Sequence, residues 1–394
     1  MKLKFIIVFI SIFALSHSVT FAKDVPDWLS RAVKQSDQQL SKAVTAFEHA
    51  DANPRTIENG AVRVVNYRDW TSGFYPGSLW YMYELTGKES YKIAAKHHTV
   101  ILEPAQFRLN THDLGFILYC SYGNAYRLTT DSGYLKVMTQ GAHSLMKRYN
   151  SKIGVIKSWD PGVGPWGFPV IIDNMMNLEF LYTIGRMTGD SSMIQACVSH
   201  TNRTMENHFR KDNSSYHVID YDVNSGDVIS KHTHQGLHHE SSWARGQAWG
   251  LYGFTMMYRM TFNPEYLKQA VKIAEYIIQH PRLPEDKIPY WDFDAKDIPN
   301  VPRDASAAAI MASALLELYS FVPEKTYYFN IAEDMLKSLS STAYLATPGE
   351  NGLFLLKHAT GNMPFSSEID TALSYADYYF LEAILRYQSI IKTM

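Results

Sequence analysis

Four aspartates each stand just before a long apolar run with helical spacing. They are Asp113, Asp173, Asp304 and Asp370. An aspartate in this position commonly caps a helix N-terminus, and we expect that role alone for Asp304 and Asp370. The other two have richer surroundings, because His112 precedes Asp113 and a loop with Trp159 and Trp166 precedes Asp173. Asp113 and Asp173 are therefore the candidates for chemistry.

Carboxylates close to tryptophans are typical of sugar sites, in which an indole stacks on a sugar face while carboxylates bond hydroxyls or move protons. Two such groups suit general acid–base catalysis on a glycosidic or related bond. The acid must hold its proton near neutral pH. Burial among aromatic rings raises a carboxyl pKa, whereas a helix N-terminus lowers it. We expect Asp113 to be ionised and Asp173 to exchange the proton.

The segment 231–254 is dense in functional side chains. Its histidines include His232, His234, His238 and His239. No companion set of carboxylates or thiolates accompanies them, so we predict substrate or surface contacts and no metal or cofactor. Arg245 and Trp249 are four residues apart and share a helix face, where a guanidinium fork beside an indole could hold a sugar carboxylate. A buried tryptophan with a capping arginine would explain the same spacing equally well.

A repeated plan positions these residues. Six apolar runs, rich in small and aromatic residues, cover 73–87, 113–129, 171–189, 245–261, 304–319 and 370–387. Each follows a more polar helical run, beginning with 28–47. The pattern predicts an all-α (α/α)6 barrel of six inner and six outer helices, as one domain over 23–394. A solenoid has similar periodicity, but the long aromatic loops 150–172 and 211–242 argue against it. Alternating helices would bring all inner N-termini to one mouth.

Bulk composition adds little to the functional argument. The formal net charge of −2 gives no reason to expect nucleic acid or a membrane surface as a partner. Residues 1–22 have basic Lys2 and Lys4, an apolar run over 5–15 and a small Ala22, as in a secretory signal. We therefore expect a periplasmic or secreted protein, with an uncleaved anchor as the alternative.

Only two cysteines are present, Cys120 and Cys197, and each lies among apolar residues of a helical run. Two buried thiols are expected instead of a disulfide. The chain has no CxxC pair, Gly-rich phosphate loop, HExxH or GxSxG motif. Redox, nucleotide and serine-hydrolase interpretations therefore lose their best support.

Several segments together resemble the unsaturated glucuronyl hydrolases, glycoside hydrolase family 88. The segments are DWTSGFYPGSLW, THDLGF, WGFPVIIDNMMNLE, HQGLHHESSWARGQAWGLYG, PRDASAAAI and YADYYFLEAILR, spread over 69–386. The resemblance implies an (α/α)6 barrel that acts on oligosaccharides with a 4,5-unsaturated uronic acid at the non-reducing end. It implies that Asp173 protonates the vinyl ether and then activates water, with Asp113 as the second essential carboxylate.

The resemblance also implies a set of substrate-binding residues. By motif position these are Trp70, His112, Trp159, His217, Gln235, Trp243, Arg245 and Trp249, with Ser366 and Ser367 as candidates in the C-terminal loop. The implied partners are unsaturated uronyl oligosaccharides from chondroitin, hyaluronan or heparin, handled without a cofactor by a monomer or weak homodimer. The alternatives are a family 105 rhamnogalacturonyl hydrolase on pectin fragments, a non-catalytic glycan-binding toroid, or another (α/α)6 enzyme, since this fold hosts many chemistries.

Overall fold

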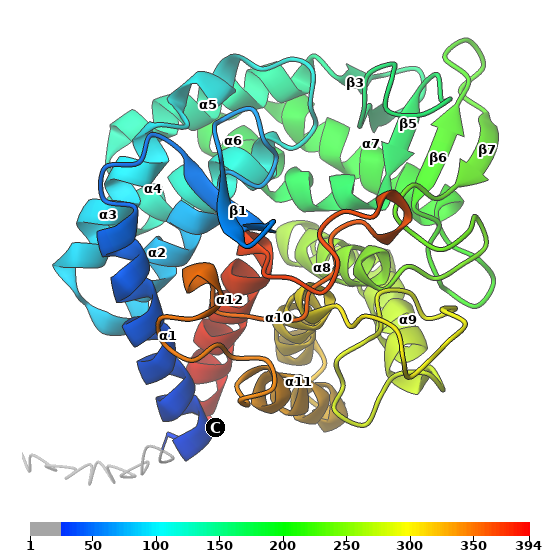
Figure 1. Ribbon diagram of the computed structural model, residues 1–394. Coiled ribbons are helices and arrows are strands. Elements are labelled where there is room, and N and C mark those ends of the chain that lie inside the picture. Colours follow the sequence, from blue (N-terminus) through cyan, green and yellow to red (C-terminus); the bar gives the residue numbers. More distant parts are fainter. Residues whose placement is uncertain (1–24) are drawn as a thin grey trace, which may run out of the picture.

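The computed structural model describes residues 25–394, so the expected signal segment 1–22 lies outside the described residues. Two concentric rings of helices make up the molecule, with α8, α10 and α12 in the interior and α1, α3, α5, α7, α9 and α11 around them (Figure 1). The predicted (α/α)6 barrel is confirmed. Within the described residues, no helix combines the length and apolar character needed to cross a membrane.

The inner ring consists of apolar helices that are buried on almost every side. Its members are α2 (Phe74–Thr86), π-helix η2 (Gly115–Gly123) continued by α4 (Asn124–Thr129), 3-10 helix η3 (Ile172–Asn177) continued by α6 (Leu178–Thr188), α8 (Ala244–Thr261), α10 (Ala305–Phe321) and α12 (Ser374–Ile391). The last inner helix, α12, packs against the first, α2, so the ring is closed. Closure excludes the solenoid alternative.

The outer ring is amphipathic, with one apolar stripe facing inward. Its members are α1 (Asp27–Ala46), α3 (Glu89–Val100), α5 (Ser132–Met146), α7 (Ser191–Asn207), α9 (Pro264–Gln279) and α11 (Thr326–Leu339). In α9, for example, Tyr266, Ala270, Ile273 and Ile277 are fully buried at helical spacing. This spacing places one face on the inner ring and leaves the other in solvent.

Small residues allow the inner helices to approach one another closely. A Cβ atom added at Gly73, next to α2, would lie 2.2 Å from the carbonyl oxygen of Phe116 in η2. Glycine is therefore required at this contact. Glycine also ends two inner helices, since Gly87 and Gly189 follow α2 and α6 with left-handed backbone conformations.

The long loops at one mouth of the barrel contain small antiparallel sheets. The strands are β1 (Asn53–Glu58), β2 (Ala61–Val65), β3 (Tyr149–Asn150), β4 (Val155–Ile156), β5 (Pro169–Ile171), β6 (Val218–Tyr221) and β7 (Val228–His232). Strands β5, β6 and β7 form one sheet in that order, beside α7 in Figure 1. Strand β5 runs directly into η3, so this sheet fixes the position of the Asp173 segment.

Of the two helix caps predicted from the sequence, one is confirmed and one is wrong. The cap prediction holds for Asp304, whose carboxylate accepts hydrogen bonds from the Ser306 and Ala307 amides at the start of α10. It is wrong for Asp370, because α12 begins only at Ser374. Asp370 is exposed, has a φ of 51° and binds His358 Nδ1 at 2.6 Å.

The two cysteines agree with their prediction. Cys120 and Cys197 are buried free thiols on separate helices, η2 and α7. Burial raises the pKa of both thiols, so neither has the character of an activated nucleophile.

Candidate active site

A cavity of about 200 Å³ opens at the mouth where the inner helices begin. Nine of the residues singled out from the sequence line it: Trp70, His112, Asp113, Trp159, Asp173, His234, Gln235, Arg245 and Ser367. These residues come from loops and helix starts that are up to 297 positions apart, between Trp70 and Ser367. The alternating helices thus bring both candidate carboxylates and the aromatic residues into one site, as the repeat predicted.

Asp173 lies in the first turn of η3, immediately after strand β5. Its side chain is almost entirely buried, and within residues 25–394 its Oδ2 has no hydrogen-bond partner. Burial raises the pKa of Asp173 to about 7, the negative charge of Asp113 acts in the same direction, and the charge of Arg245 opposes it. Desolvation therefore outweighs the nearby guanidinium, and Asp173 can hold a proton near neutral pH.

His217 stands behind Asp173, just before strand β6. Its Nδ1 accepts hydrogen bonds from the backbone amides of His234 at 3.1 Å and Gln235 at 3.2 Å. Burial lowers the pKa of His217 well below its usual value. A neutral ring whose Nδ1 is an acceptor carries its proton on Nε2. That Nε2–H group lies 3.6 Å from Asp173 Oδ2 and has no other partner among the described residues.

Asp113 is held by its sequence neighbours. The Thr111 hydroxyl donates to Oδ2 at 2.7 Å, and His112 Nε2 lies 3.2 Å from Oδ1. Burial lowers the pKa of His112, so its ring is a neutral donor. Asp113 Oδ2 thus accepts a hydrogen bond from Thr111, and its Oδ1 lies near a neutral imidazole, whereas Oδ2 of Asp173 has no hydrogen-bond partner among the described residues. The two aspartates differ in environment in the direction that the sequence suggested.

Asn177 joins the segments that carry the two aspartates. Its Oδ1 accepts a hydrogen bond from the Phe116 amide at 3.0 Å, which ties η3 to the start of η2. A Cβ at Gly115 would lie 2.7 Å from Asn177 Cα, so the contact requires glycine. The helix that begins at Gly115, η2, is a π-helix. Such turns are rare and often occur at functional sites.

Arg245 lines the cavity but does not present the open fork that its position suggested. Its Nη1 donates to Asp304 Oδ2 at 2.8 Å and to the Thr360 carbonyl at 2.5 Å, and its Nη2 donates to the Gly361 carbonyl. The guanidinium lies over Trp243 at 4.6 Å from the ring centroid. Arg245 therefore fixes the loop after 357 and supplies positive charge beside Asp173.

Two of the predicted tryptophans line the cavity, and the other two pack behind it. Trp70 and Trp159 line the cavity, whereas Trp243 packs beneath it against His217, with ring centroids 4.6 Å apart. Trp249 is fully buried and packs on Phe116 at 5.3 Å. Trp249 is therefore a buried packing residue next to a structural arginine, which was the alternative weighed from the sequence. It does not offer a ring face to the substrate.

Of the remaining predicted residues, some line the cavity and others lie outside it. Gln235 and Ser367 line the cavity, and Gln235 Nε2 donates to the Gly361 carbonyl at 3.1 Å. Ser366 is exposed outside it. In the histidine segment, His234 lines the cavity, whereas His232 packs against the exposed His239. Within 25–394, no three His, Cys, Asp or Glu side chains are grouped to hold a metal ion.

Sequence reasoning missed a second charged group at the cavity. Arg55 of β1 donates from Nε to Glu368 Oε1 and from Nη1 to Asp69 Oδ2, both at 2.6 Å. Arg55 and Glu368 both line the cavity, together with Phe116 and Tyr375. The tyrosine follows the apolar pattern of α12 and could have been found from it. No local motif marks Arg55 or Glu368, because they are 313 positions apart and only the closed ring joins them.

Comparison with known proteins decides the family. The sequence pattern of Glycosyl Hydrolase Family 88 matches residues 41–379. The chain belongs to glycoside hydrolase family 88. It is 45% identical over 372 residues to an unsaturated glucuronyl hydrolase of Formosa agariphila, covering 91% of this chain and 93% of that protein. It is 32% identical to an unsaturated chondroitin disaccharide hydrolase of Streptococcus agalactiae, covering 91% of each.

A solved structure of an unsaturated glucuronyl hydrolase specific for heparin superimposes with a TM-score of 0.91 at 53% identity, covering 92% of this chain and 98% of that one. These similarities bear out the family 88 resemblance and make the chain a glycoside hydrolase. They decide against family 105 and against the non-catalytic toroid weighed from the sequence. The catalytic roles of Asp173 and Asp113 stay predictions, and the geometry above gives them a physical basis, whereas it gives none to a substrate contact by Ser366 or Trp249.

Proposed function

We propose that this family 88 hydrolase removes the 4,5-unsaturated uronic acid from the non-reducing end of glycosaminoglycan oligosaccharides produced by lyases. The observation that carries the proposal is the placement of Asp173, a buried carboxyl with a pKa raised to about 7 at the base of an aromatic-lined cavity. A neutral acid of this kind can donate a proton at physiological pH. The named functions of the relatives support the same substrate class.

The proposed reaction is hydration of a vinyl ether. Protonated Asp173 gives its proton to C4 of the double bond, and positive charge develops at C5 and the ring oxygen. Water adds at C5 and returns a proton to the Asp173 carboxylate, which restores the acid. The hemiketal at C5 opens to a ketone, and the hemiacetal left at C1 releases the next sugar. The sum is one water added, with no covalent intermediate on the protein.

The surrounding residues have defined parts in this proposal. The negative charge of Asp113 stabilises the developing cation and adds to the raised pKa of Asp173. The Nε2–H group of His217 faces Asp173 Oδ2 and stabilises the carboxylate formed after proton transfer. Trp70 and Trp159 supply ring faces for sugars.

The test follows the ultraviolet absorbance of the conjugated double bond in unsaturated disaccharides. Absorbance should fall with the wild type and stay constant with Asp173→Asn. Asp377→Asn is a matched control, because Asp377 is also buried with its pKa raised to about 7 but lies outside the catalytic cavity. Full activity of Asp173→Asn, or cleavage of saturated oligosaccharides by the wild type, would overturn the proposal.

Heparin-derived disaccharides are the first substrates to compare, since the relative with 53% identity is named for heparin and the relative with 32% identity for chondroitin. Ratios of kcat/KM for unsaturated heparin, chondroitin and hyaluronan disaccharides would rank them. A higher ratio for chondroitin or hyaluronan would contradict this order.

We also propose export through residues 1–22, on the basis of Lys2, Lys4 and the apolar run over 5–15. N-terminal sequencing of the mature protein should begin near Lys23 if the signal is removed after Ala22. The proposed monomer or weak homodimer is checked by light scattering at several concentrations, and a stable larger assembly would contradict it.

A further inference from the structure

A second, larger cavity of about 510 Å³ opens at the other end of the barrel. Its residues follow the catalytic ones along the same inner helices. Thus Glu179 and Thr183 follow Asp173, and Tyr378 and Glu382 follow Tyr375. Its rim includes the exposed Met187 and Ser389, so the cavity is open to solvent. None of the catalytic steps proposed above uses it.

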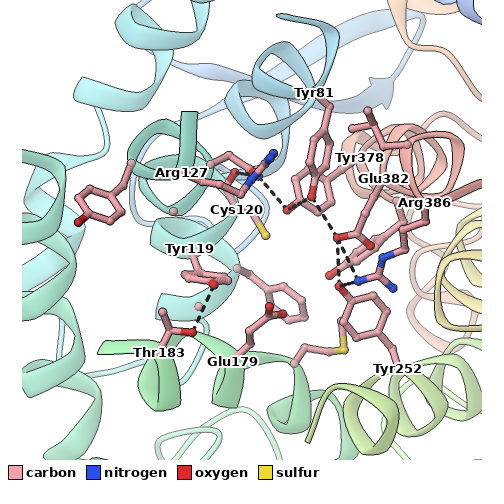
Figure 2. Close-up of a pocket in the computed structure, with 18 of the residues that line it drawn as sticks. Tyr81, Tyr119, Cys120, Arg127, Glu179, Thr183, Tyr252, Tyr378, Glu382 and Arg386 are labelled. Atoms are coloured by element: carbon pink, nitrogen blue, oxygen red, sulfur yellow. Dashed lines mark hydrogen bonds and ion pairs between the residues drawn. The ribbon is translucent and has the colours of Figure 1, made fainter. Parts of the chain in front are cut away.

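The walls combine tyrosine rings with hydrogen-bonding groups. Figure 2 shows Tyr119 and Cys120 of η2 on one side of the space and Tyr252, Tyr378 and Glu382 on the other. The Tyr81 and Tyr252 hydroxyls each donate to Glu382 Oε1 at 3.0 Å, which fixes both rings. Rigid rings beside carboxylates and guanidiniums are features of saccharide sites. The volume lies within the ~300–1,000 Å³ range of small-molecule sites.

The charges in this cavity are paired. Arg127 binds both oxygens of Glu84 at 2.9 and 2.6 Å, and Arg259 binds Glu179 at 2.9 Å. Arg386 binds Glu317 at 2.9 Å. In the part of the chain that the structure describes, all three guanidiniums that line the cavity have a carboxylate partner, so an anionic sugar would find no free guanidinium there. A neutral sugar, which needs only hydroxyl contacts and ring faces, meets no such penalty.

The second cavity also contacts the catalytic machinery. Gly115, Phe116, Tyr119 and Cys120 of η2 line it, and Phe116 lines the catalytic cavity as well. The start of η2 is bonded to Asp113, since the Ile117 amide donates to the Asp113 carbonyl at 3.0 Å. A molecule seated on η2 would therefore contact the segment that positions Asp113.

We propose that this second cavity is a non-catalytic saccharide site that binds a neutral sugar ring, such as an N-acetylhexosamine released by the reaction. The choice of occupant rests on the proposed function, whereas the site itself rests on the cavity geometry. The anionic keto-uronate product is excluded by the paired charges.

The test measures binding of N-acetylglucosamine and N-acetylgalactosamine by titration calorimetry. Thr183→Trp fills the cavity from α6, and Arg186→Trp places the same side chain on the solvent face of that helix as a matched control. Saturable binding is expected in the wild type and in Arg186→Trp, with at least ~10-fold weaker binding in Thr183→Trp. Ser389→Trp at the exposed rim should give the same loss and guards against misfolding of the first variant.

Trp159→Ala separates this site from the catalytic one. If the neutral sugar binds in the second cavity, its binding should be unchanged in that variant, because Trp159 lines only the catalytic cavity. Absence of saturable binding in the wild type, or binding that is lost in Trp159→Ala and kept in Thr183→Trp, overturns the proposal. Loss of double-bond absorbance is measured separately, so a failure of the proposed reaction is distinguishable from a failure of this site.

Discussion

His217 Nε2 lies 3.6 Å from Asp173 Oδ2, and two backbone amides on Nδ1 hold the imidazole in that orientation. The pair consists of a carboxyl that burial keeps protonated and an N–H donor that burial keeps neutral. Because the histidine carries no charge, it does not force Asp173 to ionise, and its dipole stabilises the carboxylate once the proton has left. This arrangement suits an acid that must give and regain one proton.

The pH dependence of activity should follow Asp173. The acid must be protonated to start the reaction, and its pKa is raised to about 7. We expect kcat/KM to fall about tenfold per pH unit above pH 7. A profile measured by double-bond absorbance checks this, and a rate that is constant up to pH 9 would show that another group supplies the proton.

Removing the His217 donor should shift the pH above which kcat/KM falls, which we call the alkaline limb of the profile. His217→Ala removes the N–H group that faces Asp173 and favours its charged form. The limb in kcat/KM should shift to higher pH, while the maximum rate falls about 10- to 100-fold. His208→Ala, which removes another buried neutral histidine outside the cavity, should leave the position of the limb unchanged. An unshifted limb in His217→Ala would assign His217 a packing role only.

The raised pKa of Asp173 should also lower the free energy of unfolding of the protein at neutral pH. In the native state it keeps its proton up to about pH 7, whereas the usual value is 3.8. The native state therefore binds more protons between these values, and stability falls as pH rises through this window and then levels off. Asp173→Asn removes the effect, so its advantage over the wild type should grow by about 2 to 3 kcal/mol between pH 5 and pH 7. Urea unfolding measures it.

Asp190→Asn, at a half-buried position on the surface, is the control for that series. Asp190 caps α7 through the Ser192 amide, and asparagine caps helices equally well. Its difference from the wild type should stay small at both pH values. If the difference in free energy of unfolding between Asp173→Asn and the wild type does not change with pH, the raised pKa of Asp173 is contradicted.

The buried pair between Arg245 and Asp304 should be essential to the fold of the mouth. Their side chains are 1% and 0% exposed, and the atoms lie 2.8 Å apart. Asp304→Ala leaves a buried guanidinium without its carboxylate and removes the α10 cap, so a loss of about 3 to 5 kcal/mol is expected. Glu206→Gln, which breaks the exposed pair with Arg203, should cost less than about 1 kcal/mol. Chemical denaturation compares the two.

The sequence determined the barrel and its two aspartates. Alternating apolar and amphipathic runs specify which helix faces are buried, and closure follows because α12 must cover α2. Asp113 and Asp173 stand ahead of inner helices, so alternation alone brings them to one mouth. The same logic failed at Asp370, because the loop from 361 to 373 replaces the expected first turn with a sheet-like bridge between Ala359 and Thr371.

Only the tertiary structure decided how the charges are paired. Arg245 is committed to Asp304 and two carbonyls, and Arg55 is committed to Glu368 and Asp69. Asp304 and Glu368 come from other turns of the ring than the arginines that they bind, and no local spacing encodes either pair. The sequence could not decide the pKa of Asp173 for the same reason. Desolvation and the charge of Asp113 raise that pKa, whereas the charge of Arg245 lowers it. Burial and distance set that balance, and both exist only once the ring has closed.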